Sequence, residues 1–256
     1  MYQAAWPTLL DDVGGADDAR ARQLTGSVVV LGLAEPEGFA PGALSARLFH
    51  GALPLEHRLE LAGAMADVPV EPTALLLSRL DSADAAERAV AARALGAPCH
   101  KKACARLRRA THDLDARVRK AALHALPALG DRRAAASALA ALADVDATVR
   151  RAAVAALCAL TGALAGAADR LALARAVGDA DVDVRCAGLA ALIVVGGLEA
   201  RAAGKGALND PAPEARALAV QLLARHGHHD DAAALHDDPD ARVRRAVKEA
   251  RLRAVA

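Results

Sequence analysis

Two short segments of the chain carry side chains that could bind a metal ion. Imidazole nitrogens and thiolates are common ligands of zinc and other transition metals. Neither segment has the spacing of a closed four-ligand site, and the alternative for the histidine-rich one is a polar turn between helices. We therefore predict no metal and no other cofactor, although the histidine-rich segment keeps metal binding open. The two candidate sets are Cys99, His100 and Cys104, and His226, His228, His229, Asp230, Asp231 and His236.

No set of residues in the sequence pairs a nucleophile with a base. Ser27 follows a glycine, but the G-x-S-x-G pattern that places a nucleophilic serine on a sharp turn is absent. The glycines at 204 and 206 lack the spacing and the hydroxyl residue of a phosphate-binding loop. We expect a protein without catalytic residues.

A basic segment is the best candidate for binding a partner. Residues 99–151 hold 12 basic and 5 acidic residues, in a chain whose net charge is only +1. Clustered cations attract phosphates or the carboxylates of an acidic protein, and the alternative is that they form solvated helix faces. Nucleic acid is the less favoured partner because all four aromatic residues lie within residues 1–49, so none can stack on bases here. The residues that we expect to contact a partner are Arg93, Lys101, Lys102, Arg117, Lys120, His124 and Arg151.

The elements that position these side chains repeat along the chain. One arginine recurs with steps of 31, 31, 35, 31 and 28 residues, and an acidic turn precedes most of its occurrences. A period near 30 residues is typical of stacked helical repeats. These residues, called the signature arginines below, are Arg88, Arg119, Arg150, Arg185, Arg216 and Arg244.

Each repeat carries the start and stop signals of a helix. In the unit that begins at Asp113, six apolar residues from Val118 to Leu129 recur at helical spacing, which predicts one buried stripe. Aspartates before the stripe can cap free backbone N–H groups. A second helix precedes the next unit, so each repeat is a helix pair that must stack on its neighbours. Glycines suited to helix C-termini follow four consecutive signature arginines, at Gly130, Gly162, Gly196 and Gly227.

The segments DLDARVRKAALHAL and DVDATVRRAAVAAL resemble HEAT-like repeats, especially the short repeats of phycobilisome-lyase-type proteins. The resemblance covers about residues 56–256 and implies an all-α, right-handed solenoid whose Val-Arg helices line the concave face. It also implies a ladder of hydrogen bonds between adjacent turns, in which the signature arginines pair with Asp115, Asp146 and Asp181. The repeat at Arg216 has alanine in place of the second acid, so we expect a weaker ladder contact there.

The two ends of the chain differ from the middle. Residues 1–55 do not fit the repeat and are predicted to form a divergent N-terminal cap, with Trp6, Phe39 and Phe49 packed on the first repeat; an aromatic anchor for a partner is the alternative. Residues 56–256 are predicted to hold five to six repeats, the last one a capping helix with a polar outer face. No secretory pattern begins the chain and the longest uncharged run is 17 residues, so we expect a cytoplasmic protein.

These features favour a non-enzymatic scaffold or adaptor that binds a protein partner through an extended repeat surface. Two alternatives stay open. The resemblance implies a lyase- or chaperone-like factor that acts on a prosthetic group of another protein. The basic segment is also compatible with a nucleic-acid-binding repeat protein, whose affinity would fall steeply with salt.

Overall fold

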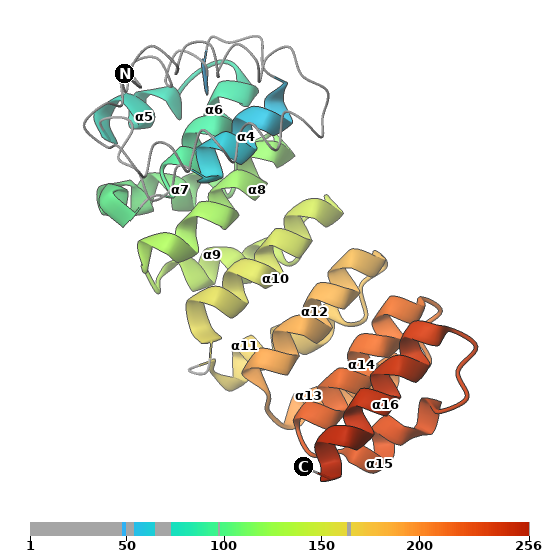
Figure 1. Cartoon of the computed structure of the whole chain (residues 1–256). Helices are drawn as coiled ribbons and strands as arrows, with labels where there is room; N and C mark the ends of the chain where they lie inside the picture. The colour runs from blue at the N-terminus through green and yellow to red at the C-terminus, as the bar shows by residue number, and fades with distance from the viewer. Residues whose placement is uncertain (1–47, 50–53, 65–72, 97, 163–164, 256) are drawn as a thin grey trace, which may run out of the picture. The chain divides into compact units, whose positions relative to one another are not determined.

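The computed structural model describes residues 48–49, 54–64, 73–96, 98–162 and 165–255. Within these ranges the chain forms helices joined by short turns, with no strand among them (Figure 1). The chain divides into two compact units, Met1–Ala134 and Ala135–Ala256, called unit 1 and unit 2. The predicted N-terminal cap lies almost entirely outside the described residues, as do Trp6 and Phe39.

Unit 1 contains three successive helices, α4, α6 and α8, that pack on one another in chain order. A shorter helix or 3₁₀ segment lies between each pair, with α5 against α6 and α7 against α8. Phe49 is buried, and the Arg79 guanidinium of α5 lies 4.7 Å from its ring centroid. The elements are α4 (Leu55–Ala64), α5 (Thr73–Arg79), α6 (Ala85–Ala94), η3 (Pro98–Ala103), α7 (Cys104–Ala110), α8 (Ala116–Ala125) and η4 (Leu126–Leu129).

Unit 2 repeats this plan with longer helices. Helices α10, α12, α14 and α16 pack side by side in chain order, and α11, α13 and α15 lie against them as a second layer (Figure 1). Helix α9 (Ala134–Ala141) begins at the division between the units. The others are α10 (Ala147–Thr161), α11 (Ala167–Ala176), α12 (Val182–Val195), α13 (Leu198–Ala207), α14 (Pro213–Arg225), α15 (His229–Ala232), η6 (Ala233–Leu235) and α16 (Ala241–Val255).

The helices that carry the signature arginines, called the signature helices, start and stop where the sequence signals lie. An aspartate caps the N-terminus of five of them, by accepting a hydrogen bond from an N–H two residues later at 2.8–2.9 Å. The glycines at 130, 162, 196 and 227 all have positive φ, between 48° and 79°, as predicted for helix C-termini. The pattern therefore sets the helix bounds from both ends.

The predicted apolar stripe of the second repeat is buried throughout. Its six residues from Val118 to Leu129 are each at most 4 % exposed. The α-helical part nevertheless ends at Ala125, and the stripe continues through the 3₁₀ segment η4. The physical reason is Pro127, which has no N–H to donate to the preceding turn.

Candidate functional site

The signature arginines are the most regular polar feature of the structure. Each one donates from Nη1 to two backbone carbonyls, six and five residues before it, at 2.7–3.2 Å. Those carbonyls belong to the turn that precedes the signature helix. The arginine therefore closes its own turn and holds its guanidinium in one orientation, with Nε and Nη2 left to face another partner.

Four signature arginines use Nε and Nη2 to bind an aspartate of the following repeat. The distances from nitrogen to carboxylate oxygen are 2.7–2.9 Å, which is a bidentate, charge-assisted pair. Each of these aspartates also accepts the N–H two residues later, at 2.8–2.9 Å. The pairs are Arg88–Asp113 in unit 1, and Arg150–Asp179, Arg185–Asp210 and Arg216–Asp238 in unit 2.

The acids named for the ladder from the resemblance have a different role in the structure. Asp115, Asp146 and Asp181 cap their own helices, because a carboxylate at the N-cap turns toward the N–H groups of its own first turn. The ladder carboxylate stands two residues earlier in each turn. The contact at Arg216 is fully formed, because its acceptor is Asp238 of the next repeat. Alanine at 212 removes a helix cap, while Asp210, two residues before it, still binds Arg185 as a ladder acid.

Several ladder and cap acids have lowered pKa values, which hold them in their charged form. Arg150 lowers the pKa of Asp179, and Arg216 lowers that of Asp238, in each case through the side-chain hydrogen bonds. The hydrogen bonds from Arg117 lower the pKa of Asp115 to about 2. These acids stay ionised under physiological conditions and serve as fixed acceptors between and within repeats.

The residues predicted to contact a partner are distributed over both units. Arg151 belongs to unit 2 and donates to Asp183 at 3.2 Å, whereas the other six belong to unit 1. Arg117, Lys120 and His124 share one face of α8, but Arg117 is bound to the cap Asp115. The remaining three differ in exposure: Arg93 is half-buried and burial lowers its pKa, while Lys101 and Lys102 are exposed on η3.

Other cations of the basic segment are neutralised by acids. Arg106 binds Asp81, and Asp131 binds Arg108 and also Arg133. Lys101, Lys102, Arg109 and Arg132 are exposed and form no ion pair with the described residues. Among the described residues of unit 1, these four side chains are the exposed cations without an ion pair.

The two candidate metal-binding segments are used for packing and turns where the structure describes them. His100 is buried and its Nδ1 lies 2.7 Å from the hydroxyl of Thr73, and the side chain of Cys99 is outside the described residues. His226 lies against Gly196, with Nε2 at 3.2 Å from the carbonyl of Leu192. Within the described chain, no group of three or more His, Cys, Asp or Glu side chains is placed to hold a metal ion.

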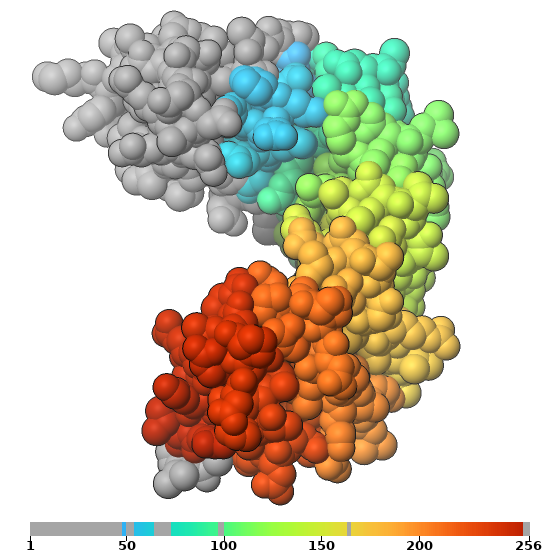
Figure 2. Space-filling model, turned by 90° about the vertical axis from the view of Figure 1, so that its right-hand side faces the viewer, coloured from blue at the N-terminus to red at the C-terminus, as the bar shows by residue number. Residues whose placement is uncertain are grey.

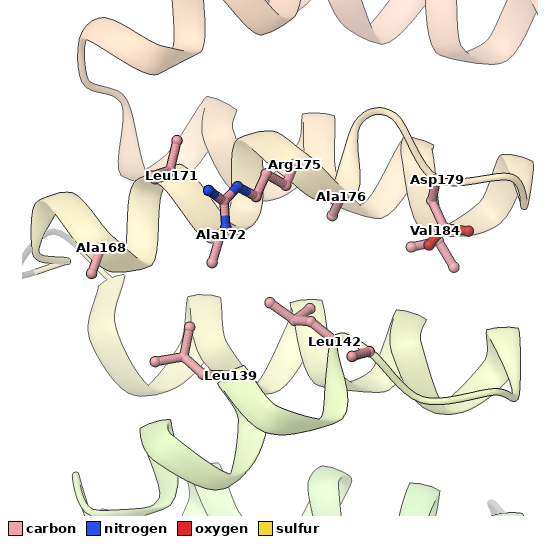
Figure 3. Close-up of a pocket in the computed structure, with 10 residues that line it drawn as sticks. Leu139, Leu142, Ala168, Leu171, Ala172, Arg175, Ala176, Asp179 and Val184 are labelled. Atoms are coloured by element: carbon pink, nitrogen blue, oxygen red, sulfur yellow. The ribbon is translucent and has the colours of Figure 1, made fainter.

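A cleft of about 490 Å³ in unit 2 lies between α9 and α11. Leu139 and Leu142 face α11 across it, where alanines form most of the opposite wall (Figure 3). Leu171 lines the cleft and is 45 % exposed. Arg175 at the C-terminal end of α11 also lines it, is exposed, and forms no ion pair with the described residues.

Sequence reasoning missed this cleft. Leu171 and Arg175 sit in a companion helix outside the repeated text, and nothing in their spacing distinguishes them from other helix residues. The cleft exists because α9 and α11 stand apart, which is a property of helix placement.

Among the described residues no helix is long and apolar enough to cross a membrane.

Comparisons with known proteins agree with this architecture. Residues 73–158 match the family model described as HEAT repeats. No curated protein gives a significant sequence match. Among solved structures, YibA from Escherichia coli is similar with a TM-score of 0.60 and 15 % identity, over 95 % of this chain and 96 % of that one. The complex of CpcE and CpcF of phycocyanin lyase from Nostoc sp. PCC7120 is similar with a TM-score of 0.51 and 20 % identity, over 94 % and 93 %.

At these identities the likenesses concern the fold. They agree with the stacked helix pairs described above. Residues 73–158 thus match HEAT repeats, and the chain has the fold of HEAT-like repeat proteins.

Proposed function

We propose that this chain is a non-enzymatic adaptor that binds an acidic protein segment through its repeat surface. The supporting observation is the cleft between α9 and α11, which combines apolar walls with one exposed cation, Arg175. The ladder acids and arginines are consumed in holding the repeats together. Asp179 also lines the cleft but is bound by Arg150, so the side chains that the cleft offers to a partner are apolar or cationic.

The cleft suits an amphipathic helix that carries leucine-like side chains beside carboxylates. An apolar side chain placed between Leu142 and Leu171 would gain about 1.5–3 kcal/mol from burial. Arg175 would bind a carboxylate of the partner helix that lies on the same face as that apolar side chain, about one helical turn from it. Docking of an amphipathic helix into an apolar groove is a general mode of peptide recognition.

The exposed cations of unit 1 support the same class of partner. Lys101, Lys102, Arg109 and Arg132 would raise the rate of encounter with an acidic protein by long-range attraction. The half-buried Arg93 and the paired Arg117 and Arg151 have less charge to offer, so we assign the main contribution to the lysines of η3. Lys120 and His124 share one face of α8, and we include them among the residues that would contact the partner.

Neither alternative function gains a specific observation. A lyase-type role would use a nucleophile, and burial raises the pKa of the Cys104, Cys158 and Cys186 thiols, which keeps them protonated. Nucleic-acid binding would draw on the same cations as the proposed acidic partner. The two partner classes differ in their dependence on salt and in their need for an apolar side chain.

The test is titration with a labelled 16-residue helical peptide that carries leucines at i, i+4 and i+7, flanked by glutamates. We expect R175E to weaken binding about tenfold, as a reversed charge at a carboxylate contact should. The matched control R225E reverses an exposed charge on α14, away from the cleft, and should leave binding unchanged. Equal binding of a peptide with lysines in place of the glutamates, or no effect of R175E, would overturn the proposal.

A further inference from the structure

The last signature arginine, Arg244, presents an unused binding edge. Its Nη1 donates to the carbonyls of Asp238 and Pro239 at 2.7 and 2.9 Å, so its guanidinium is anchored like those of the other repeats. Its Nε and Nη2 contact no acid within the described part of the chain. Four other arginines of this molecule use the same two nitrogens to bind an aspartate, which shows what such an edge accepts.

Other positions on this face of α16 also differ from the equivalent positions of the preceding repeats. The residues four and seven positions after a signature arginine are buried and apolar in the preceding repeats, as for Val220 and Leu223 of α14. Those two side chains pack against the buried side of α16. In α16 itself the equivalent positions are Lys248 and Arg251, both exposed.

The three cations lie at i, i+4 and i+7, so they share one face of α16 with the 73 % exposed Leu252. Helix α16 lies at the surface of unit 2 (Figure 2). Two other cations of α16 are neutralised by nearby acids, because Arg242 binds Asp240 and Glu214, and Arg245 binds Glu249. A cap that only needed to be soluble would require no anchored guanidinium at its centre.

We infer that Arg244, Lys248 and Arg251 form a docking surface for an acidic turn of a partner protein. The internal ladder defines the occupant: an aspartate whose carboxylate also accepts the N–H two residues later, as in Asp238-Pro239-Asp240. Further carboxylates on the partner would meet Lys248 and Arg251. The inference rests on the proposed function only in taking an acidic protein as the partner, since it uses a surface separate from the cleft.

A second copy of this chain does not fit as the occupant in the register of the ladder. The first described repeat has Ser82 at the position of the ladder acid, and its hydroxyl accepts the N–H of Asp84. Asp84 in turn caps α6. The later ladder acids at 113, 179, 210 and 238 are bound by the arginines of their own chain.

The test uses the whole chain and a fluorescein-labelled peptide of sequence EEDPDAEE, with QQNPNAQQ as the uncharged match. We expect only the acidic peptide to bind, with K248E and R251E each weakening binding about fivefold to tenfold through the reversed charge. R244K keeps the positive charge but loses the pair of donors, Nε and Nη2, that can bind a carboxylate in a bidentate way. It should weaken binding about threefold or more. R225E, which reverses an exposed charge at the end of α14, should stay within about twofold of the parent chain.

Three outcomes would overturn the inference. One is equal binding by the parent chain, K248E and R251E, since these exposed positions can be changed without disturbing the core. Another is tighter binding of a 20-base-pair DNA duplex than of the peptide, with loss in the same variants, which would assign the surface to nucleic acid. The last is concentration-dependent self-association that R244K abolishes. If R175E loses binding of the cleft peptide but binds EEDPDAEE as the parent chain does, the two proposals concern separate surfaces and can fail independently.

Discussion

The guanidinium of each of the four ladder arginines divides its donors between two repeats. In Arg150, Nη1 donates to a carbonyl in the turn of its own repeat, while Nε and Nη2 donate to the carboxylate of Asp179 in the next repeat. The Arg150–Asp179 pair is 14–16 % exposed, so loss of one partner strands a largely buried charge. In contrast, Arg151 and Asp183 are about half exposed or more, and such pairs contribute little.

Replacing Arg150 with alanine should therefore lower the free energy of unfolding by about 1–3 kcal/mol, because a charge-assisted hydrogen bond is lost and its acceptors are left unpaired. The neighbouring variant R151A should cost less than about 1 kcal/mol. Urea unfolding of both variants at neutral pH measures the difference. Equal and negligible effects would contradict a structural role for the ladder.

Single substitutions at helix ends act on whole elements. The N-cap residue of helix α14 is Ala212, whose φ of −83° and ψ of 123° match those of the aspartate caps of other signature helices. The backbone is thus ready for a cap that the side chain does not supply. The glycines show the opposite case, in which the side chain is absent because the backbone requires it.

A212D should stabilise the protein by about 1 kcal/mol, because it supplies the missing acceptor for the first turn of α14. A212N separates the cap from the charge and should recover most of the gain. Thermal and urea unfolding report both values. No gain in either variant would show that Pro213 or a neighbouring acid already limits this helix start.

Two glycines should respond in opposite directions to alanine. Gly206 lies in the last turn of α13, where an added methyl group would point into open space, so G206A should stabilise by about 0.5 kcal/mol. Gly196 has φ of +69° and a Cβ there would stand 2.8 Å from the His226 ring, so G196A should destabilise by more than about 1 kcal/mol. Denaturant midpoints decide the sign of each change, and equal signs would contradict this interpretation.

The sequence allows the helices to be predicted far better than the site. Caps, stripes and stop glycines are local signals, and the predicted aspartates and glycines bracket helices α10 and α12 in the structure. The ladder partner was misassigned by two residues because both aspartates of an acidic turn can reach an N–H, and only the packed turn shows which one faces Arg150 or Arg216. The cleft depends on the distance between α9 and α11, which no local pattern encodes.

At the scale of the whole molecule the same acids set the response to pH. The pKa values of Asp179 and Asp238 are lowered by their arginines, and Asp115 and Asp240 have pKa values of about 2 because of Arg117 and Arg242. Aspartates in an unfolded chain have a pKa of about 3.9. Between those values the folded chain binds fewer protons than the unfolded chain, so protons drive unfolding.

The free energy of unfolding should therefore have its full value above about pH 5 and decrease as the pH is lowered from about 4 toward 2. D179N removes one shifted carboxylate and should make the decline shallower, although the variant starts from a lower stability. Urea unfolding at a series of pH values gives both slopes. A parent chain whose stability stays flat down to about pH 2.5, or a D179N slope equal to it, would contradict the prediction.

The ladder link has a direction, since in each of the four pairs the arginine of one repeat donates to the aspartate of the next repeat. A duplicated stretch of about 31 residues would bring its own arginine and its own aspartate, and both would find partners in the neighbouring copies. Tandem duplication within the gene can therefore lengthen such a protein without leaving an unmatched charge in its interior. The number of repeats becomes a variable that evolution or an engineer can change one copy at a time.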